Sequence, residues 1–314
     1  MFRHHKVAVV VAAYNEEKLI AKTVTTLPSF IDRMYVIDDC SSDDTNEIIT
    51  GLASKDSRVI ALRNDPNRGL GATFTRGFEE FLKEEAMDFI VTMPGDAQCN
   101  PDYIENMLTT LIDNKLDYVK ANRFVHLDDL EQMPKFRRIG NIVITLITKF
   151  ASGYYSIFDS QNGYGVFPRS TLERMRLSDI GQRYDYENTL LIALAIMGAR
   201  IRDEAVPAIY GEETSTIPFF RTVFRALNVL WRGFWKRIYY RYIVVNFHPM
   251  ALFLIAGLFL MLIGFIVGVG IVIDRLWGGN SPSTGTVMLC VLPIILGFQL
   301  LLTSMLMDIG NEAK

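Results

Sequence analysis

Clusters of carboxylate and amide side chains directly follow two short apolar runs near the start of this 314-residue chain. The first run, residues 7–13, leads into Tyr14-Asn15-Glu16-Glu17, and the second, residues 34–37, leads into Asp38 and Asp39. Ionised carboxylates only accept hydrogen bonds, so this pair of aspartates suits the N–H and O–H donors of a nucleobase or ribose. The alternative is that both carboxylates stabilise a turn and the start of the next helix.

A third acidic group, Asp96, follows the expected strand 88–93 and is followed two positions later by Gln98. Hard divalent cations such as Mg²⁺ and Mn²⁺ prefer oxygen ligands, and they often bind one or two carboxylates together with substrate phosphates. Such an ion would neutralise the charge that develops on a diphosphate leaving group. We therefore expect Asp96 and Gln98 to hold a divalent metal. A simple turn, in which Asp96 caps the next helix, is the alternative.

Two arginines are candidates for phosphate binding. Arg68 and Gly71 lie within residues 67–72, directly before an expected helix, where backbone N–H groups and a cation could hold a phosphate. Arg123 lies just past residues 118–121, at the end of another expected strand, where its cation could also meet a phosphate. An ordinary loop and a solvated surface arginine are the respective alternatives.

The later part of the chain contributes carboxylates that could act as acids or bases. Asp185 and Glu187 open an expected helix over residues 188–197, so capping of that helix is the alternative role. Two further polar stretches lie at residues 159–165 and 210–215. The four histidines are far apart, and no Ser–His–Asp arrangement is readable. This favours reactions that need no strong general base.

The elements that must position these groups alternate between strand and helix. Short β-branched apolar runs bounded by polar residues predict strands that are buried on both faces, as in a parallel sheet. The carboxyl ends of such strands meet at one edge, where ligands bind. The pattern therefore predicts a doubly wound α/β sheet. The expected strands are 7–13, 34–37, 59–62, 88–93, 118–121 and 166–167.

Helix starts are expected from capping residues. Asn15 is an expected N-cap for a helix that reaches about Leu27. Asp44 and Glu47 have the spacing of a capping box for a helix that reaches about Ser54. Pro101 suits the first turn of a further helix. The other expected helices are 72–85, 139–150 and 188–197.

The last third of the chain has membrane character. Charged residues make up 21% of the chain, yet none occurs in residues 249–273 or 278–307, and each stretch reaches the roughly 20 apolar residues of a membrane span. Two spans joined by a short loop predict a hairpin, and the Arg and Lys excess before Pro249 predicts a cytoplasmic location for both chain ends.

Residues 219–242 predict an amphipathic helix in the membrane interface. Four basic residues of this segment fall on one side of a helix, and a set of apolar residues, Leu230 and Phe234 among them, falls on the other. The basic stripe consists of Arg221, Arg225, Arg232 and Lys236. The alternative is an ordinary amphipathic helix on a soluble core. The expected organisation is therefore 1–217 for the α/β domain, 218–246 for the interfacial region and 247–314 for the hairpin.

Composition and charge exclude several classes. A net charge of −3 argues against a nucleic-acid binder, which normally has a strong basic excess. The three scattered cysteines form neither a disulfide framework nor a zinc spacing. Residues 1–13 faintly resemble a signal peptide, but their apolar part is short and lacks an A-x-A-like site, so a buried first strand is expected.

Taken together and in order, these residues resemble glycosyltransferase family 2, and within it the polyprenyl-phosphate glycosyltransferases such as dolichyl-phosphate mannose or glucose synthases. The resemblance runs from about Lys6 to Ile217. The matching motifs are Ala13-Tyr14-Asn15-Glu16-Glu17, Asp38-Asp39-Cys40-Ser41-Ser42-Asp43-Asp44, Asn67-Arg68-Gly69-Leu70-Gly71, Gly95-Asp96-Ala97-Gln98, Asn122-Arg123-Phe124 and Asp159-Ser160-Gln161-Asn162-Gly163-Tyr164.

The resemblance implies a GT-A fold, a nucleotide-sugar donor and a divalent metal, Mg²⁺ or Mn²⁺. It implies that Asp96 and Gln98 hold the metal, and that Arg123 and Arg138 are candidates for phosphate contacts. The residues that it implies for the donor are Ala13, Tyr14, Glu16, Asp38, Asp39, Arg68 and Gly71. The chain departs from the family's Asp-x-Asp motif, because Pro94 replaces the first aspartate. It also lacks a Gln-x-x-Arg-Trp motif, which counts against a processive polysaccharide synthase.

The chemistry of a lipid monophosphate agrees with this resemblance. Its second pKa is about 6, so it is mostly dianionic at neutral pH and can attack an anomeric carbon without a protein base. Catalysis then reduces to positioning and charge stabilisation. We therefore expect an inverting transfer from a UDP- or GDP-sugar to dolichyl or undecaprenyl phosphate on the cytoplasmic face of a membrane. The oligomeric state, including a homo-oligomer, stays open.

Two alternatives remain at this point. A transferase that acts on another lipid or glycan would need a base, for which Asp185 or Glu187 is the choice. A catalytically inactive scaffold that binds only nucleotide or partners is the other, and it is motivated by the missing first aspartate at position 94.

Overall fold

The computed structural model describes the chain except residues 124–134, 184, 208–218, 279–280 and 314. Side chains are also left undescribed for residues 135–139, 141 and 219–225. The chain divides into two compact units, residues 1–234 and 235–312. The predicted interfacial segment, 218–246, therefore contributes to both units.

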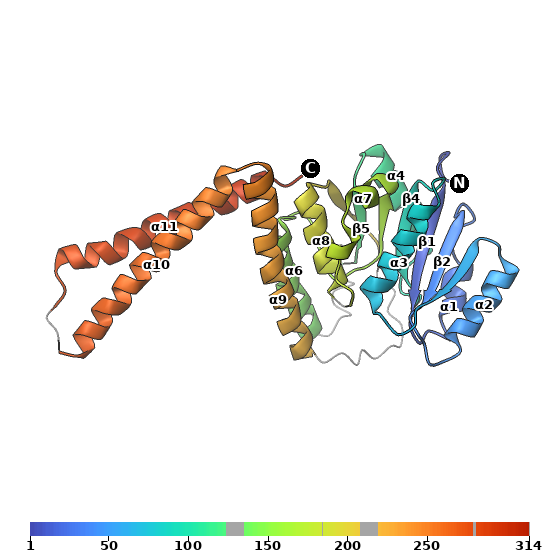
Figure 1. Cartoon of the computed structure of the whole chain (residues 1–314), viewed down its shortest axis with the longest axis horizontal. Helices are drawn as coiled ribbons and strands as arrows, with labels where there is room; N and C mark the ends of the chain where they lie inside the picture. Colours follow the sequence, from blue (N-terminus) through green and yellow to red (C-terminus); the bar gives the residue numbers. More distant parts are fainter. Residues whose placement is uncertain (124–134, 184, 208–218, 279–280, 314) are drawn as a thin grey trace. The chain divides into compact units, whose positions relative to one another are not determined.

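A seven-stranded sheet with helices on both faces forms the first unit (Figure 1). The strand order is β3-β2-β1-β4-β6-β5-β7, and β6 is antiparallel to both of its neighbours. This confirms the predicted mostly parallel, doubly wound sheet. The strands are β1 (Val7–Ala13), β2 (Arg33–Asp38), β3 (Val59–Arg63), β4 (Phe89–Pro94), β5 (Tyr118–Asn122), β6 (Gly165–Pro168) and β7 (Ile201–Ala205).

Strand β1 explains why its sequence is an unbroken apolar run. It lies between β2 and β4, and all seven of its residues are buried. Alternate residues face opposite sides of a strand, so Val9 packs into one core layer and Val10 into the other. The expected buried first strand is confirmed.

The edge strand β7 was not predicted. Its sequence, Ile-Arg-Asp-Glu-Ala, is mostly polar, and as a strand at the end of the sheet it has a single neighbour, β5. An edge strand of this kind lacks the continuous apolar run that marks a buried one. The register pairs Lys120 of β5 with Asp203 of β7.

The helices cover the two faces of the sheet. Ile49 of α2 and Met107 of α4 belong to the core layer that contains Val9, whereas Phe78 of α3 and Leu194 of α8 belong to the layer that contains Val10. The helices of this unit are α1 (Ile20–Thr25), α2 (Thr45–Lys55), α3 (Leu70–Lys83), α4 (Ile104–Asp113), α6 (Lys135–Ser152), α7 (Arg169–Arg174), α8 (Tyr186–Met197) and most of α9 (Phe219–Arg237), with single 3₁₀ turns at Pro101–Tyr103 and Leu177–Asp179.

One expected helix start was wrong, and one expected cap bond does not form, although α2 begins directly after Asp44 as expected. Helix α1 begins at Ile20 rather than after Asn15, and Asn15 adopts a left-handed backbone with φ of 56°. The reason is tertiary, because the backbone N–H of Asn15 donates to Ser41 in the loop after β2. The capping box at Asp44 does not form, since Asp44 makes no side-chain cap bond. Asp43 instead accepts from the backbone N–H of Thr45 at 3.1 Å.

Helix α9 packs on the first unit where its side chains are described. Leu230 and Phe234 join Ala151 of α6 and Ile192 of α8 in a small apolar cluster. These two residues were expected to face the membrane interface, so this part of the apolar stripe is corrected. Gly233 permits the close approach, because a Cβ at this position would lie 2.1 Å from Cδ1 of Ile192.

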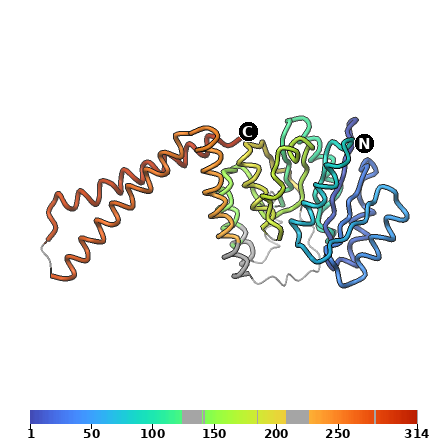
Figure 2. The backbone as a smooth tube through the Cα atoms, in the orientation of Figure 1, coloured from blue at the N-terminus to red at the C-terminus, as the bar shows by residue number. Residues whose placement is uncertain are grey.

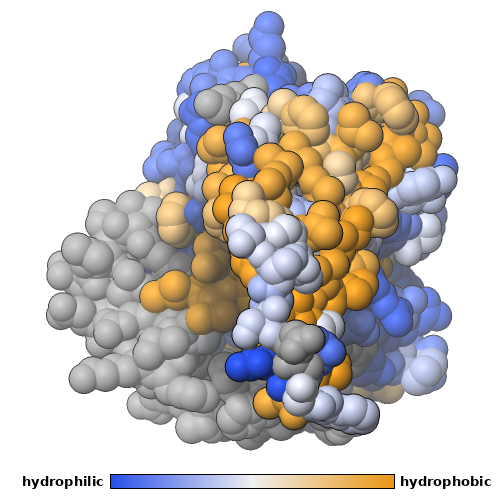
Figure 3. All heavy atoms as spheres, turned by 90° about the vertical axis from the view of Figure 1, so that its left-hand side faces the viewer, coloured by the Kyte–Doolittle hydropathy of each residue, from blue (hydrophilic) through white to orange (hydrophobic). Residues whose placement is uncertain are grey.

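The second unit contains two long antiparallel helices, α10 (Pro249–Leu276) and α11 (Thr284–Gly310), which form a hairpin (Figure 2). Both helices are long and apolar enough to cross a membrane. Apolar side chains cover much of the hairpin surface in Figure 3. A π-helical turn, η3 (Ile238–Val245), connects α9 to α10. The helices meet closely at two glycines, Gly257 and Gly297, each of which faces the carbonyl oxygen of the other.

Candidate active site

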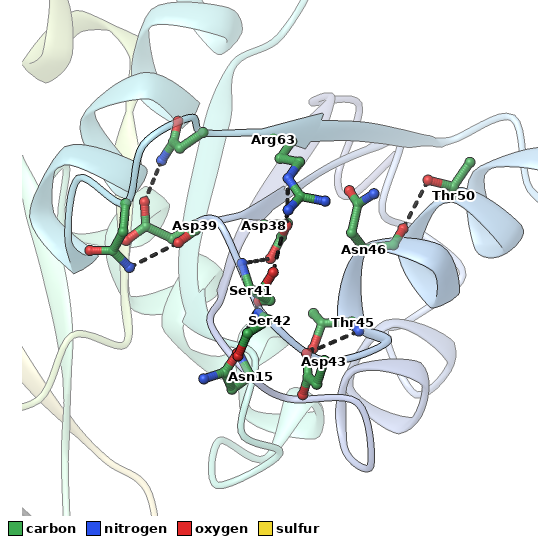
Figure 4. Close-up of polar contacts among 12 residues, drawn as sticks. Asn15, Asp38, Asp39, Ser41, Ser42, Asp43, Thr45, Asn46, Thr50 and Arg63 are labelled. Carbon is green, nitrogen blue, oxygen red and sulfur yellow. Dashed lines mark hydrogen bonds and ion pairs between the residues drawn. The ribbon is translucent and has the colours of Figure 1, made fainter.

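The loops that follow β1 and β2 are joined by hydrogen bonds, so the two acidic clusters of the sequence lie together. The side-chain oxygen of Asn15 accepts from the backbone N–H of Ser42 at 2.9 Å, and the two residues face each other in Figure 4. The backbone N–H of Glu16 donates to the hydroxyl of Thr45 at 2.8 Å. Tyr14 remains 52% exposed at this edge, with its ring available to a ligand.

Asp38 is fully buried at the end of β2, and one of its oxygens has no hydrogen-bond partner. Its Oδ1 accepts from the backbone N–H of Ser41 at 3.1 Å, whereas its buried Oδ2 has only the Nε of Arg63 nearby, at 3.4 Å. Figure 4 shows Arg63 reaching toward Asp38 from the end of β3. Arg63 was missed in the sequence, although a basic residue that ends an apolar run beside two acidic strand ends was a usable signal.

Asp39 organises the loop that was expected to hold a phosphate. Its Oδ1 accepts from the backbone N–H of Arg68 at 2.9 Å and from the side-chain amide of Asn64 at 2.8 Å. Its Oδ2 accepts from the backbone N–H of Gly69 at 2.7 Å. These two backbone N–H groups therefore bind a buried carboxylate rather than a phosphate, whereas a phosphate contact of the Arg68 side chain stays a prediction.

Gly71 has a packing role. A Cβ at this position would lie 1.9 Å from the carbonyl oxygen of Gly181, so only glycine lets the start of α3 approach that segment. The next backbone N–H, that of Ala72, donates to the carbonyl of Gln182 at 2.9 Å. Close backbone contact between α3 and the turn before α8 accounts for this glycine without a ligand.

Asp96 lies two residues past β4, at the same edge of the sheet. Its Oδ1 accepts from the backbone N–H of Gln98 at 3.0 Å, and burial raises the pKa of its carboxyl. The described residues contain no group of three His, Cys, Asp or Glu side chains that could hold a metal alone. Asp96 fits as a single carboxylate ligand, with a substrate diphosphate completing the coordination, because Mg²⁺ is often bound in this way.

Arg123 forms a two-point ion pair with the buried Asp159 from the polar stretch before β6. Its Nε and Nη2 lie 2.7 and 2.9 Å from the two carboxylate oxygens. Burial alone would raise the pKa of Asp159, but the hydrogen bonds and charge of Arg123 lower it below the ordinary value. The expected position of Arg123 at a strand end is confirmed, and Asp159 of the polar stretch 159–165 proves to be its partner.

Glu187 is the second carboxylate near Arg123. Burial raises its pKa from 4.5 to about 7, with the charges of Asp159 and Asp185 adding to the shift and that of Arg123 opposing it. Its Oε1 faces Gly163, where an added Cβ would lie 3.4 Å away. Asp185 instead accepts from the backbone N–H of Arg183 at 3.1 Å, and its carboxylate packs against Gly181.

Two expected site regions lie outside the described residues. Arg138 is located in α6, but its side chain is not described, and residues 210–215 fall within an undescribed segment. The predicted residues that directly follow β1, β2, β4 and β5 lie at one edge, because these parallel strands place their carboxyl ends together. The register pairs Ala13 with Asp38, Ala12 with Pro94 and Asp38 with Arg63.

Residues 8–176 match the family model described as Glycosyl transferase family 2. The chain is 28% identical over 250 residues to the UDP-N-acetylglucosamine–dolichyl-phosphate N-acetylglucosaminyltransferase of Methanococcus voltae, which covers 76% of this chain and 94% of that protein. It is 25% identical over 199 residues to the undecaprenyl-phosphate mannosyltransferase of Micrococcus luteus, which covers 62% of this chain and 80% of the relative.

Solved structures show the same fold. The glucosyl-3-phosphoglycerate synthase of Mycobacterium tuberculosis, in complex with Mn²⁺, UDP and glucosyl-3-phosphoglycerate, superposes with a TM-score of 0.51. The sequences are 16% identical, and the match covers 74% of this chain and 80% of that chain. The sheet and its helices therefore form a GT-A fold, as expected.

Proposed function

Because the chain belongs to glycosyltransferase family 2, we propose that it transfers a sugar from a nucleotide sugar to polyprenyl phosphate at a membrane surface. The relatives named for dolichyl and undecaprenyl phosphate support this acceptor. The observation that carries the proposal is the convergence of Asp38, Asp96 and Arg123 at the carboxyl edge of one GT-A sheet.

The nucleoside end of the donor belongs at the ends of β1, β2 and β3. The buried Oδ2 of Asp38 has no hydrogen-bond partner, so it can accept from a base N–H if Arg63 shifts aside or joins the contact. The exposed ring of Tyr14 offers a stacking surface for the base. Asp39 holds the neighbouring loop in place and supports this end of the site indirectly.

The diphosphate belongs near Asp96. A divalent metal bound there, with Gln98 as the second expected ligand, would offset the negative charge that accumulates on the leaving nucleoside diphosphate. Structures of the mycobacterial synthase contain Mn²⁺ or Mg²⁺ together with UDP, which supports this assignment. Arg123 and Arg138 would add positive charge close to the phosphates of donor and acceptor.

The acceptor phosphate needs no base, because its dianion is already nucleophilic at neutral pH. A direct displacement by this oxygen would invert the anomeric carbon. The chain's own residues would then act by orienting the donor diphosphate and the acceptor phosphate and by holding them together. Such positioning and charge stabilisation provide most of the rate acceleration when the nucleophile needs no activation.

Helix α6 supports a location at a bilayer surface. Its buried face is partly polar, since it includes Thr145, Thr148 and Ser152 as well as Ala151. Its exposed large side chains are apolar, namely Ile142, Val143, Leu146 and Phe150. An amphipathic helix with its apolar face outward suits the interface of a membrane, and the two bilayer-length helices α10 and α11 would tether the protein there. The Arg and Lys residues before α10 favour the cytoplasmic side.

The proposal is tested with full-length protein in detergent, polyprenyl phosphate and a panel of UDP- and GDP-sugars, with the product identified by mass. A glycolipid should form with one donor, disappear with chelator and return with Mn²⁺ or Mg²⁺. Asp96→Asn should abolish turnover, whereas Asp102→Asn, an exposed aspartate in the next turn, should retain it. Nucleotide binding without any transfer would support an inactive scaffold instead.

A second candidate, transfer to a hydroxyl acceptor, is favoured by Glu187. A carboxyl with a pKa of about 7 near Arg123 is suited to general-base catalysis at neutral pH. Glu187→Gln should leave transfer to polyprenyl phosphate intact if the acceptor is a dianion. Loss of turnover by on the order of 10²–10⁴-fold in this variant would indicate a hydroxyl acceptor that needs the base.

A further inference from the structure

Lys120 and Asp203 form a buried ion pair between β5 and β7, the two strands at one end of the sheet. Lys120 is 2% exposed, and its Nζ lies 3.4 Å from Oδ1 of Asp203. Removing two charges from water costs several kcal/mol for each ion unless pairing and hydrogen bonds offset it, so such a pair calls for a reason beyond stability.

The two side chains hold opposite sides of one tight turn. The Lys120 Nζ donates to the carbonyl of Asp159 at 2.8 Å. Asp203 Oδ2 accepts from the backbone N–H of Phe158 at 2.5 Å. The turn needs this support, because Asp159 has a positive φ of 48°, a conformation that costs a non-glycine residue about 1–3 kcal/mol.

The supported turn carries the carboxylate that orients Arg123. Asp159 binds Nε and Nη2 of Arg123 and also its backbone N–H, at 3.2 Å. We propose that Lys120 and Asp203 are positioning residues, which fix the 158–159 turn so that Arg123 is held at the site edge beside Asp96 and Glu187. The effect on catalysis rests on the proposed function, whereas the effect on the turn does not.

A purely structural role makes a different prediction. Replacement of a buried ion pair by apolar residues of similar size is often neutral or stabilising. The double variant Lys120→Met/Asp203→Leu should therefore keep the fold, while it removes the donor to Asp159 and the acceptor for Phe158. If the pair serves only stability, the turn and Arg123 will behave as in the parent protein.

Hydrogen–deuterium exchange of the full-length protein in detergent tests the turn without any substrate. Peptides covering residues 156–163 should exchange faster in Lys120→Met/Asp203→Leu, with peptides from β1 unchanged. The matched control is Arg58→Met/Asp56→Asn, which removes an ion pair at the amino end of β3 and should leave residues 156–163 unchanged. Unaltered exchange of this segment in the double variant overturns the proposal.

A double-mutant cycle with Arg123→Lys tests the link to the site. In the parent protein, Arg123→Lys should lower kcat, and Lys120→Met/Asp203→Leu should lower it by on the order of 10–100-fold through misplacement of Arg123. When Arg123→Lys is combined with Lys120→Met/Asp203→Leu, the decrease in log kcat should be much smaller than the sum of the two separate decreases. Both changes act through Arg123, so their effects are not additive. Additive effects overturn the proposal. If the apolar pair does not fold, Lys120→Met/Asp203→Asn still removes the donor to Asp159, and residues 156–163 should again exchange faster.

The two experiments separate the inference from the proposed function. Faster exchange with no glycolipid from any donor would leave the positioning role intact and reject the assigned reaction. Transfer to polyprenyl phosphate with unchanged hydrogen–deuterium exchange of residues 156–163 would support the assigned reaction and reject the positioning role.

Discussion

The guanidinium of Arg237 forms a two-point ion pair with Asp308, at 2.7 Å between Nη1 and Oδ1 and at 2.8 Å between Nη2 and Oδ2. The hydroxyl of Tyr242 donates to the same Oδ1 at 2.5 Å. Both charged residues are buried, and 71 positions of sequence separate them. The pair joins the end of α9 to the last turns of α11 within the second unit.

Asp308→Ala should destabilise the hairpin by about 3–5 kcal/mol, because it removes the carboxylate that pairs with the buried guanidinium of Arg237. Thermal unfolding of the full chain in detergent measures the loss. The control is Asp113→Ala, which breaks the exposed ion pair with Arg3 and should cost at most about 1 kcal/mol. Equal effects of the two substitutions would show that burial of the Arg237 pair contributes nothing.

Gly257→Leu should separate α10 from α11. A Cβ at Gly257 would lie 2.9 Å from the carbonyl oxygen of Gly297, and backbone cannot move aside as a flexible side chain would. We expect a loss of about 1–3 kcal/mol in the unfolding of the full chain. Gly270→Leu is the control, since nothing lies within 4 Å of a Cβ there. Comparable unfolding temperatures for both variants would contradict the close helix contact.

Asp39→Ala should release residues 64–69. The substitution removes the acceptor of the partly buried backbone N–H groups of Arg68 and Gly69. It also removes one of the two acceptors of the Asn64 side-chain amide, and each donor left unsatisfied costs up to about 1–3 kcal/mol. Chemical denaturation should show the loss, and nucleotide affinity should fall with it. Asp44→Ala, which removes an exposed side chain without a cap bond, should be neutral. A stable Asp39→Ala protein would mean that water replaces the carboxylate.

Glu187 should make stability fall as the pH rises. Its pKa is raised from 4.5 to about 7 in the folded protein, so the neutral form is favoured there and the full contribution is present below about pH 4.5. This contribution to the free energy of unfolding is at most about 3 kcal/mol, and it is lost as the pH rises through about 7. Glu187→Gln should therefore unfold at a higher temperature than the parent at pH 8, with a smaller difference at pH 5. If the difference in unfolding temperature between the variant and the parent is the same at pH 5 and pH 8, the pKa of Glu187 is not raised in the folded protein.

The sequence by itself determined the sheet and the place of the site. Runs such as residues 7–13 are apolar throughout because both faces of a central strand are buried, and this pattern survives in any context. The polar residues that follow each run lie at the carboxyl edge by topology alone, so Asp38, Asp96 and Arg123 could be placed there in advance. Two charge-free stretches likewise indicated the two long helices of the hairpin.

Only the tertiary structure decided what each polar group does. Asn15 and Asp44 have the local pattern of helix caps, but hydrogen bonds between the β1 and β2 loops replace the first cap, and Asp43 replaces the second. The amides of residues 68 and 69 bind Asp39 instead of a phosphate because that carboxylate is buried directly beneath them. Ser42 lies 27 positions from Asn15, and Arg68 and Gly69 lie 29 and 30 positions from Asp39, so local propensity carries no information about these partners. The same holds for Lys120 and Asp203, which the pairing of β5 with an unpredicted edge strand brings together.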